Sequence, residues 1–174
     1  MIAIFPGHVG KDPGAVGQTA SGFKYIESVV TFSIANKVKT TLSNMGLDCR
    51  MISGQFKDRI NNSVNADYGI CIHADSFENP QIKGYHTAYY PGSMNGEVLA
   101  EFISGSMEQA GATENRSPET RNDLFMLKKT KFPCALVEVG FLTNDEECLK
   151  LHETTWQWTL ATAISYGILT YEKM

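Results

Sequence analysis

The sequence predicts an α/β fold, in which a mixed, mostly parallel and twisted sheet carries helices on both faces. Two observations lead to this prediction. Short β-type runs alternate with amphipathic helical stretches along the whole chain. No linker, internal repeat or low-complexity tract interrupts this alternation. The 174 residues, of which 43% are hydrophobic, are enough to close one substantial core, so we expect residues 1–174 to form a single domain.

The expected strands are short apolar runs bounded by turn residues. The run at 68–72 is compact and uninterrupted, as is typical of a central strand, and the run at 134–139 has the pattern of the most deeply buried strand. The polar stretch 112–122 is expected to be a loop. In chain order, the predicted strands are 2–5, 47–52, 68–72, 85–90, 124–127 and 134–139.

Helices are predicted where apolar residues recur at helical spacing. After a glycine-rich turn at 7–22, apolar side chains at positions 26, 30, 34, 38 and 42 form one stripe, and Gly46 ends this helix. Another long helix is expected over 94–109, where Gly111 stops it, and a short one over 56–65. Two helices close the chain, and the last, over 154–171, places Trp158 and Ile164 on its buried face.

Composition and charge exclude several classes of protein. A net charge of −4, with scattered Lys and Arg, leaves no basic surface for nucleic acid. No apolar run approaches the length of a membrane span, so no membrane insertion is expected. The N-terminus lacks the basic and apolar regions of a signal peptide, so we expect synthesis in the cytoplasm without one. The four cysteines lack paired short spacings and are expected to be reduced thiols.

Three candidate metal ligands stand at one predicted edge of the sheet. His8 follows the first strand, Glu27 lies in the first turn of the next helix, and His73 follows the strand at 68–72. Two imidazoles and one carboxylate, with a fourth position left for water, form the ligand set of a catalytic zinc site. Each residue also has an ordinary structural explanation. A histidine beside a glycine is common in turns, and the helix dipole favours a first-turn carboxylate.

Four ordered motifs give the chain a family resemblance. Residues 6–15 read PGHVGKDPGA and resemble the PGHGGxDPGA opening of the zinc-dependent N-acetylmuramoyl-L-alanine amidases, which include cell-division amidases and phage endolysins. Glu27 matches the second ligand of that family. Residues 72–76, IHADS, resemble its SIHANS motif, and residues 136–144, LVEVGFLTN, resemble its LVEVGFLSN motif. The resemblance covers nearly the whole chain and implies a phosphorylase/hydrolase-like fold.

The resemblance implies a set of roles for these residues. His8, Glu27 and His73 hold one catalytic Zn²⁺, and Glu138 acts first as general base and then as general acid. A glutamate that caps the following turn is the structural alternative for Glu138. Asp12-Pro13-Gly14 is interpreted as turn chemistry that shapes the ligand loop.

Three further residues are weaker candidates for substrate binding. His86 lies in a predicted strand and could contact substrate or support another residue. Arg116 and Arg121 flank the loop before Leu124 and could bind a carboxylate of the peptide stem. A packed strand histidine and a solvated loop are the competing interpretations.

The chain also departs from the family pattern at three positions. Phe5 and Val9 stand where many members have Asp and Gly, so a partner that orients His8 is missing or supplied elsewhere. Asp75 replaces the usual Asn and adds a negative charge close to the predicted site if it faces inward, but the sequence does not predict its direction.

The expected function is hydrolysis of the amide bond between N-acetylmuramic acid and L-alanine in peptidoglycan. The short connection between His73 and the predicted strand at 85–90 leaves little room for an inhibitory insertion, which favours an open lysin of phage or prophage type. We expect a monomer without a separate wall-binding domain. The protein is expected to reach the cell wall after release or export. The alternatives are a peptidoglycan-binding protein without turnover, and a zinc peptidase or deacetylase acting on another wall bond. A metal-free glycosidase using Glu27 and Glu138 is a further alternative.

Overall fold

The structure, a computed structural model, describes the backbone of residues 1–174 and all side chains except those at 114, 115 and 117. Its main sheet has six strands in the order β4-β1-β5-β8-β6-β7. Strands β4, β1, β5 and β8 are parallel to one another, whereas β6 pairs antiparallel with β8 and parallel with β7. The strands are β1 (Ile2–Pro6), β4 (Cys49–Met51), β5 (Tyr68–Asp75), β6 (Tyr85–Tyr89), β7 (Glu114–Thr120) and β8 (Cys134–Phe141).

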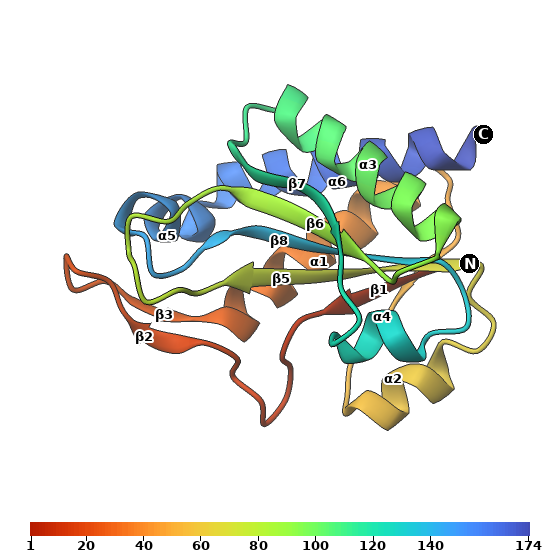
Figure 1. Cartoon of the computed structure of the whole chain (residues 1–174), viewed down its shortest axis with the longest axis horizontal. Helices are drawn as coiled ribbons and strands as arrows, with labels where there is room; N and C mark the ends of the chain where they lie inside the picture. Colours follow the sequence, from red (N-terminus) through yellow and green to blue (C-terminus); the bar gives the residue numbers. More distant parts are fainter.

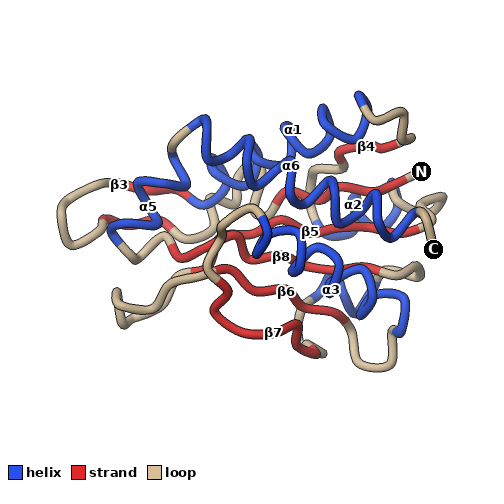
Figure 2. The backbone as a smooth tube through the Cα atoms, turned by 90° about the horizontal axis from the view of Figure 1, so that it is seen from above, coloured by secondary structure: helices blue, strands red, loops and turns tan.

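Helices cover both faces of this sheet unequally (Figure 1). The long helices α1, α3 and α6 lie together over one face (Figure 2). The short helices α2 and α4 cover one end of the other face (Figure 1). The mixed, mostly parallel α/β prediction is therefore confirmed. The helices are α1 (Glu27–Asn44), α2 (Phe56–Asn62), α3 (Met94–Gln109), α4 (Phe125–Lys129), α5 (Asp145–His152) and α6 (Thr154–Glu172).

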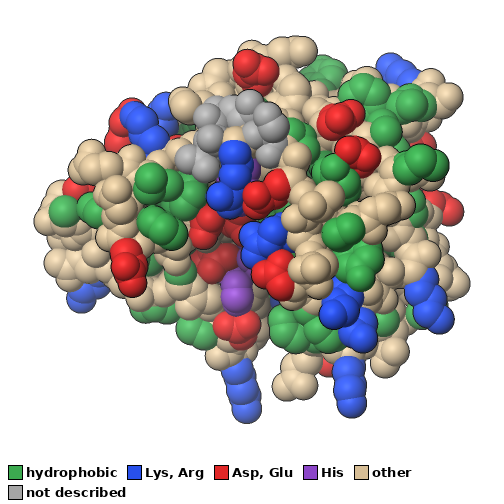
Figure 3. Space-filling view, viewed as in Figure 1, with side chains coloured by type: hydrophobic (Ala, Val, Ile, Leu, Met, Phe, Trp, Pro, Cys, Tyr) green, Lys and Arg blue, Asp and Glu red, His purple; other side chains and the backbone are tan. Residues whose placement is uncertain are grey.

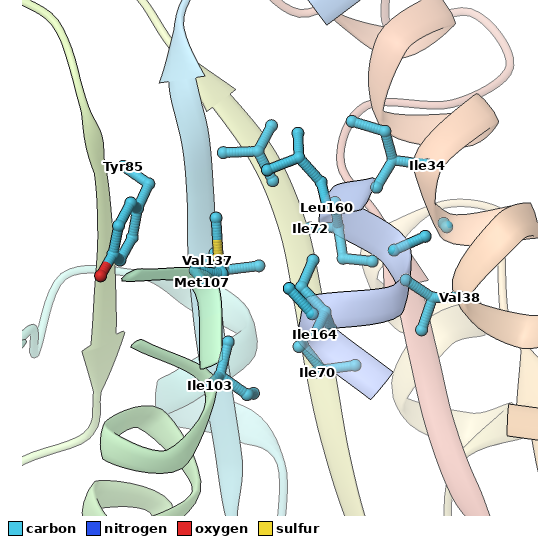
Figure 4. Packing of buried hydrophobic residues seen from close by; sticks show 14 of the residues in the cluster. Ile34, Val38, Ile70, Ile72, Tyr85, Ile103, Met107, Val137, Leu160 and Ile164 are labelled. Atoms are coloured by element: carbon cyan, nitrogen blue, oxygen red, sulfur yellow. The ribbon is translucent and has the colours of Figure 1, made fainter. Parts of the chain in front are cut away.

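The larger core lies between the sheet and α1, α3 and α6. Ile70 and Ile72 of β5 point toward Ile34 of α1 and Ile164 of α6, and all four are fully buried (Figure 4). Each such side chain contributes roughly 1.5–3 kcal/mol relative to leaving it in water. A smaller cluster that includes Cys71 packs under α2 and α4 on the opposite face.

The alternation of side chains along the strands explains where the polar candidates lie. Ile70 and Ile72 face the large core, so His73 faces the side of α2 and α4, as Cys71 does. In β8, Val137 and Val139 belong to the large core, and Glu138 between them faces the same side as His73. These polar side chains lie near the carboxyl ends of parallel strands, the usual location of sites in such sheets.

Two predicted elements are wrong. The expected strand at 124–127 is instead the helix α4, whose Met126 and Leu127 are buried. A four-residue apolar run does not distinguish a buried strand from one helical turn. The expected loop at 112–122 contains the strand β7, which lies at the edge of the sheet and pairs with β6. An edge strand needs few apolar residues and tolerates Pro118.

Smaller differences concern the segments around these elements. The glycine-rich turn includes β2 (Val16–Gln18), which pairs with β3 (Lys24–Ile26) in a separate two-stranded sheet. Strand β5 continues through His73 to Asp75 instead of ending before it. Trp158 is 41% exposed, unlike Ile164 on the same helix.

Two further predictions concern membrane insertion and the oxidation state of the cysteines. Within the described part of the chain, no helix is both long and apolar enough to cross a bilayer. All four cysteines are free thiols, as expected, and the buried Sγ atoms of Cys71 and Cys134 lie 3.9 Å apart.

Candidate metal centre and active site

The loop after β1 places His8 in an unusual backbone conformation. Its φ of 44° lies in the left-handed region, which costs a non-glycine residue of order 1–3 kcal/mol. The preceding residue is held from two directions, because Gly7 N–H donates to Ile72 O and the hydroxyl of Thr31 donates to Gly7 O at 2.6 Å. The buried guanidinium of Arg59 donates to Pro6 O at 2.9 Å. These bonds fix the position from which His8 leaves the sheet.

Glu27 joins the two histidines into one cluster. Its carboxylate is 3.4 Å from His8 Nε2 through Oε2 and 3.0 Å from His73 Nδ1 through Oε1. Oε2 also accepts a hydrogen bond from Ala15 N–H at 3.0 Å. Burial opposes ionisation of Glu27, but the hydrogen bonds from His73 and Ala15 and the nearby imidazole charge hold its pKa below the ordinary value.

The three side chains fit the ligand set of a zinc ion. One potential ligand atom from each of His8, Glu27 and His73 lies within 4.8 Å of the others. Ligands of tetrahedral zinc lie about 2.0–2.2 Å from the metal and so about 3–4 Å from one another. The 3.0 and 3.4 Å separations between ligand atoms are in that range. The structure therefore brings all three predicted ligands together.

Asp12 is the partner that orients His8, a role that the apolar Phe5 cannot fill. Asp12 Oδ2 lies 2.9 Å from His8 Nδ1, and Asp12 Oδ1 accepts a hydrogen bond from Gly14 N–H at 3.1 Å. Phe5 is fully buried in the smaller core. With Nδ1 bonded to a carboxylate, the free Nε2 of His8 faces Glu27. Asp12 therefore shapes the turn, as predicted, and also orients His8, which the sequence interpretation missed.

Two glycines allow the backbone to approach the cluster closely. A Cβ atom on Gly7 would lie 2.6 Å from the ring of His73. A Cβ atom on Gly14, whose φ is 68°, would lie 2.5 Å from Glu27 Oε2 and 2.7 Å from the His8 ring. Since real Cβ atoms do not approach other atoms this closely, a side chain at either position would displace the candidate ligands.

Glu138 lies on β8 directly beside His73 on β5. Its Oε2 atom is buried and has no hydrogen-bond partner among the described residues. Burial, followed by the charges of Asp75 and Glu27, raises the pKa of Glu138 well above its ordinary value. A raised pKa makes this carboxyl group a stronger acceptor of a proton, which is what a general base requires.

The candidate ligands and Glu138 share one open cleft. Phe56, Phe125 and Leu136 also line it, so its wall is partly apolar. The space-filling view shows acidic, basic and histidine side chains gathered together on this face of the molecule (Figure 3). Phe56 and Phe125 were not predicted as site residues, because an exposed aromatic residue on a short helix carries no sequence signal of its own.

His86 continues a row of polar residues across the sheet. It stands opposite Glu138 on one side and opposite Arg116 of β7 on the other. His86 is only 2% exposed, and its Nε2 lies 2.8 Å from Arg116 Nη2. Burial, and then the charges of Arg116 and Arg121, lower the pKa of His86 to about 4, so it is neutral at pH 7. Its burial favours a supporting place behind the cleft wall.

The two arginines differ in their surroundings. The Arg116 side chain is 44% exposed and its Nε lies 3.2 Å from Glu119. Arg121 forms two 2.8 Å hydrogen bonds with the carboxylate of Asp123, so its guanidinium is already paired. Asp75, whose direction the sequence did not predict, lines the cleft, and its Oδ2 lies 3.9 Å from His86 Nε2.

The chain matches a protein family along almost its whole length. The family model described as N-acetylmuramoyl-L-alanine amidase matches residues 2–170. The chain is 26% identical to the amidase AmiA of Salmonella typhimurium, with 98% of this chain and 75% of that protein covered. It is also 26% identical to the probable cell wall amidase LytH of Staphylococcus aureus, and it spans 57% of the length of that relative.

Solved structures give the same result. AmiC2, an N-acetylmuramoyl-L-alanine amidase of Nostoc punctiforme, superposes with a TM-score of 0.89 at 30% identity, covering 99% of this chain and 97% of that one. The catalytic domain of the amidase CwlV from Bacillus (Paenibacillus) polymyxa superposes with a TM-score of 0.88 at 26% identity, with 99% and 97% covered.

Proposed function

This chain belongs to the N-acetylmuramoyl-L-alanine amidase family, and we propose that it uses one zinc ion, held by His8, Glu27 and His73, to cleave peptidoglycan between N-acetylmuramic acid and L-alanine. The enzyme class is that of the family, an amidase acting on the cell wall. The observation that supports the zinc site is the convergence of three ligand atoms within 4.8 Å beside Glu138.

In this mechanism Glu138 moves the protons. A zinc ion bound by the three ligands would acidify a water molecule, polarise the scissile carbonyl and favour the ionised form of the neighbouring Glu138. Glu138 Oε2, which no described residue engages, accepts the proton of the attacking water. The same atom then delivers that proton to the amine of L-alanine, so that the C–N bond breaks and a neutral amine leaves.

In this proposal, substrate binding is supported by His86, Arg116 and Arg121. Arg116 Nη2 donates to His86 Nε2, so the neutral His86 orients an exposed guanidinium whose Nε lies 3.2 Å from Glu119. Its N–H groups can donate hydrogen bonds to a polar group of the substrate. Arg121 acts less directly, because its bidentate pair with Asp123 shapes the connection between β7 and α4.

We also infer that the enzyme is an open, lysin-type amidase. The connection between β5 and β6 comprises only residues 76–84, and the cleft is open to solvent. The match to AmiA extends over 222 residues although this chain has 174, so the relative carries additional residues within the matched region. A purified chain of this kind acts without an activator.

Removing the metal tests both inferences in one experiment. The chain is stripped with a chelator and titrated with zinc, and the release of amino groups from purified sacculi is followed with no other protein present. We expect no activity in the stripped protein and a linear rise that ends at one equivalent of zinc. Undiminished activity after stripping would contradict the zinc mechanism. A fully loaded protein that works only after an activator is added would contradict the open cleft.

The Asp12 to His8 contact leads to a separate prediction about zinc affinity. Replacing Asp12 with Ala removes the carboxylate that orients His8, and such partners typically contribute 10–100-fold in metal affinity. We expect Asp12→Ala to weaken zinc binding by roughly that factor, measured by competition with a chromogenic chelator. Asp12→Asn keeps an oxygen for Gly14 N–H and serves as the control for turn geometry. Equal zinc affinity in Asp12→Ala and the wild type would exclude this role.

A further inference from the structure

A second cleft adjoins the one that holds the candidate zinc ligands. One wall is the loop from Val9 to Asp12, which directly follows His8, and the other is the segment around Phe56 at the start of α2. Phe56 lines both clefts. The two clefts therefore share one aromatic side chain, and a substrate that extends from the zinc site past Phe56 would reach the second cleft.

The aromatic side chain between the clefts is held in place. Phe56 is 51% exposed and its ring packs against that of Phe125, with centroids 4.6 Å apart and planes inclined by 35°. The guanidinium carbon of Arg59 lies 6.0 Å from the centroid of the Phe56 ring. Arg59 is itself buried and bonded to the carbonyls of Gly54 and Pro6. Phe56 thus presents a fixed apolar surface to whatever occupies either cleft.

The second cleft is lined by two lysine side chains, although the net charge of the whole chain is −4. Lys11 lies on one wall and Lys57 on the other, and both are exposed. Within the described part of the structure, neither ammonium group has an ion pair or a hydrogen bond. Asp12, the acidic residue of this lining, is already bonded to His8 and Gly14. The cleft therefore combines an apolar platform with two uncompensated cations, which suits a ligand that is partly apolar and carries carboxylates.

We propose that this second cleft binds the stem peptide of the substrate, with Phe56 against its aliphatic side chains and Lys11 and Lys57 against its carboxylates. The inference rests on the proposed amidase function. Beyond the cleaved amide, the stem peptide carries free carboxylates on its acidic residues and at its C-terminus, whereas the glycan strand presents neutral sugars. Charge complementarity therefore places the peptide, and not the glycan, in the cleft between the two lysines.

The test compares two soluble substrates, a muramoyl-tripeptide with free carboxylates and the same compound with its carboxylates amidated. The double variant Lys11→Gln/Lys57→Gln should raise KM for the free acid about tenfold, as expected for two exposed ion pairs, with kcat and zinc content unchanged. The amidated substrate should show no difference between wild type and variant. The matched control is Lys39→Gln/Lys173→Gln, which removes the same charge from exposed positions on α1 and after α6.

A second variant tests the aromatic platform. Phe56→Ala should raise KM for both substrates alike, since it removes an apolar contact and no charge. An equal KM for the two substrates in the wild type, or an effect of the double lysine variant on both, would overturn the proposal.

The binding of the free tripeptide separates this proposal from the proposed function. If the zinc-loaded wild type releases no amine from either substrate, the amidase function fails, and calorimetry with the tripeptide still reports on the cleft. Binding that the double lysine variant weakens about tenfold would support the cleft. No binding by the wild type would overturn it.

Discussion

Replacing Glu138 with glutamine lowers the release of amino groups from peptidoglycan by about 10²–10⁴-fold while the protein still binds zinc. Glutamine keeps the size and shape of the side chain but cannot accept the proton of a water molecule. Because burial raises the pKa of Glu138, glutamine, which does not ionise, also removes the cost of burying a charge. We therefore expect the zinc-free variant to be at least as stable toward heat as the wild type.

The matched control for this prediction is Asp75→Asn. Asp75 lines the same cleft and its charge contributes to the raised pKa of Glu138, but its carboxylate transfers no proton in the proposed mechanism. We expect Asp75→Asn to lower the rate less than about tenfold, in the range of a modest electrostatic change. If Glu138→Gln keeps more than a tenth of the wild-type rate, or if Asp75→Asn loses as much activity as Glu138→Gln, the assignment of Glu138 is wrong.

Placing a methyl group on Gly14 should dismantle the metal centre. In Gly14→Ala the new Cβ would lie 2.5 Å from Glu27 Oε2 and 2.7 Å from the His8 ring, so two of the three candidate ligands must move. We expect zinc affinity to fall by 100-fold or more and activity to fall with it, since displacing a ligand is a larger change than removing the partner of a ligand. The measurement is chelator competition, followed by activity at saturating zinc.

Gly10→Ala provides a close control, because Gly10 has nearly the same backbone conformation. Its φ is 75° against 68° for Gly14, but a Cβ on Gly10 would meet no atom of the described residues within 4 Å, its two chain neighbours apart. Both variants should therefore lose a similar amount of stability, about 1–2 kcal/mol, because alanine is strained in the left-handed conformation. Only in Gly14→Ala does the new methyl group collide with the candidate ligands. Equal zinc affinities in the two variants would show that the close approach at Gly14 has no part in the site.

The elements with clear periodicity were predictable from the sequence. Helix α3 runs over Met94–Gln109, as its apolar spacing indicates, and the buried runs around Ile70 and Val137 are strands. The prediction failed where a segment is short or lies at an edge. Helix α4 is too short, and strand β7 has too few apolar residues, for either period to be decisive.

The candidate site was predictable only in part for a related reason. His8, Glu27, His73 and Glu138 stand in motifs that a single sequence displays. The contact between Asp12 and His8 depends on the left-handed conformation of His8, and that conformation cannot be predicted from the residue type. The row from Glu138 through His86 to Arg116 depends on the strand order β8-β6-β7, which spacing along the chain does not specify.

The most direct test of the central claim is to identify the new end groups that the zinc-loaded chain creates in purified sacculi. The digest is labelled with an amine-reactive reagent, hydrolysed and analysed by mass spectrometry, and acetate and reducing sugar ends are assayed in the same sample. We predict that L-alanine appears as the new amino terminus in step with the reaction, without acetate or new reducing ends. A different amino-terminal residue, released acetate, new reducing ends, or retention of sacculi with no new amine would contradict the account.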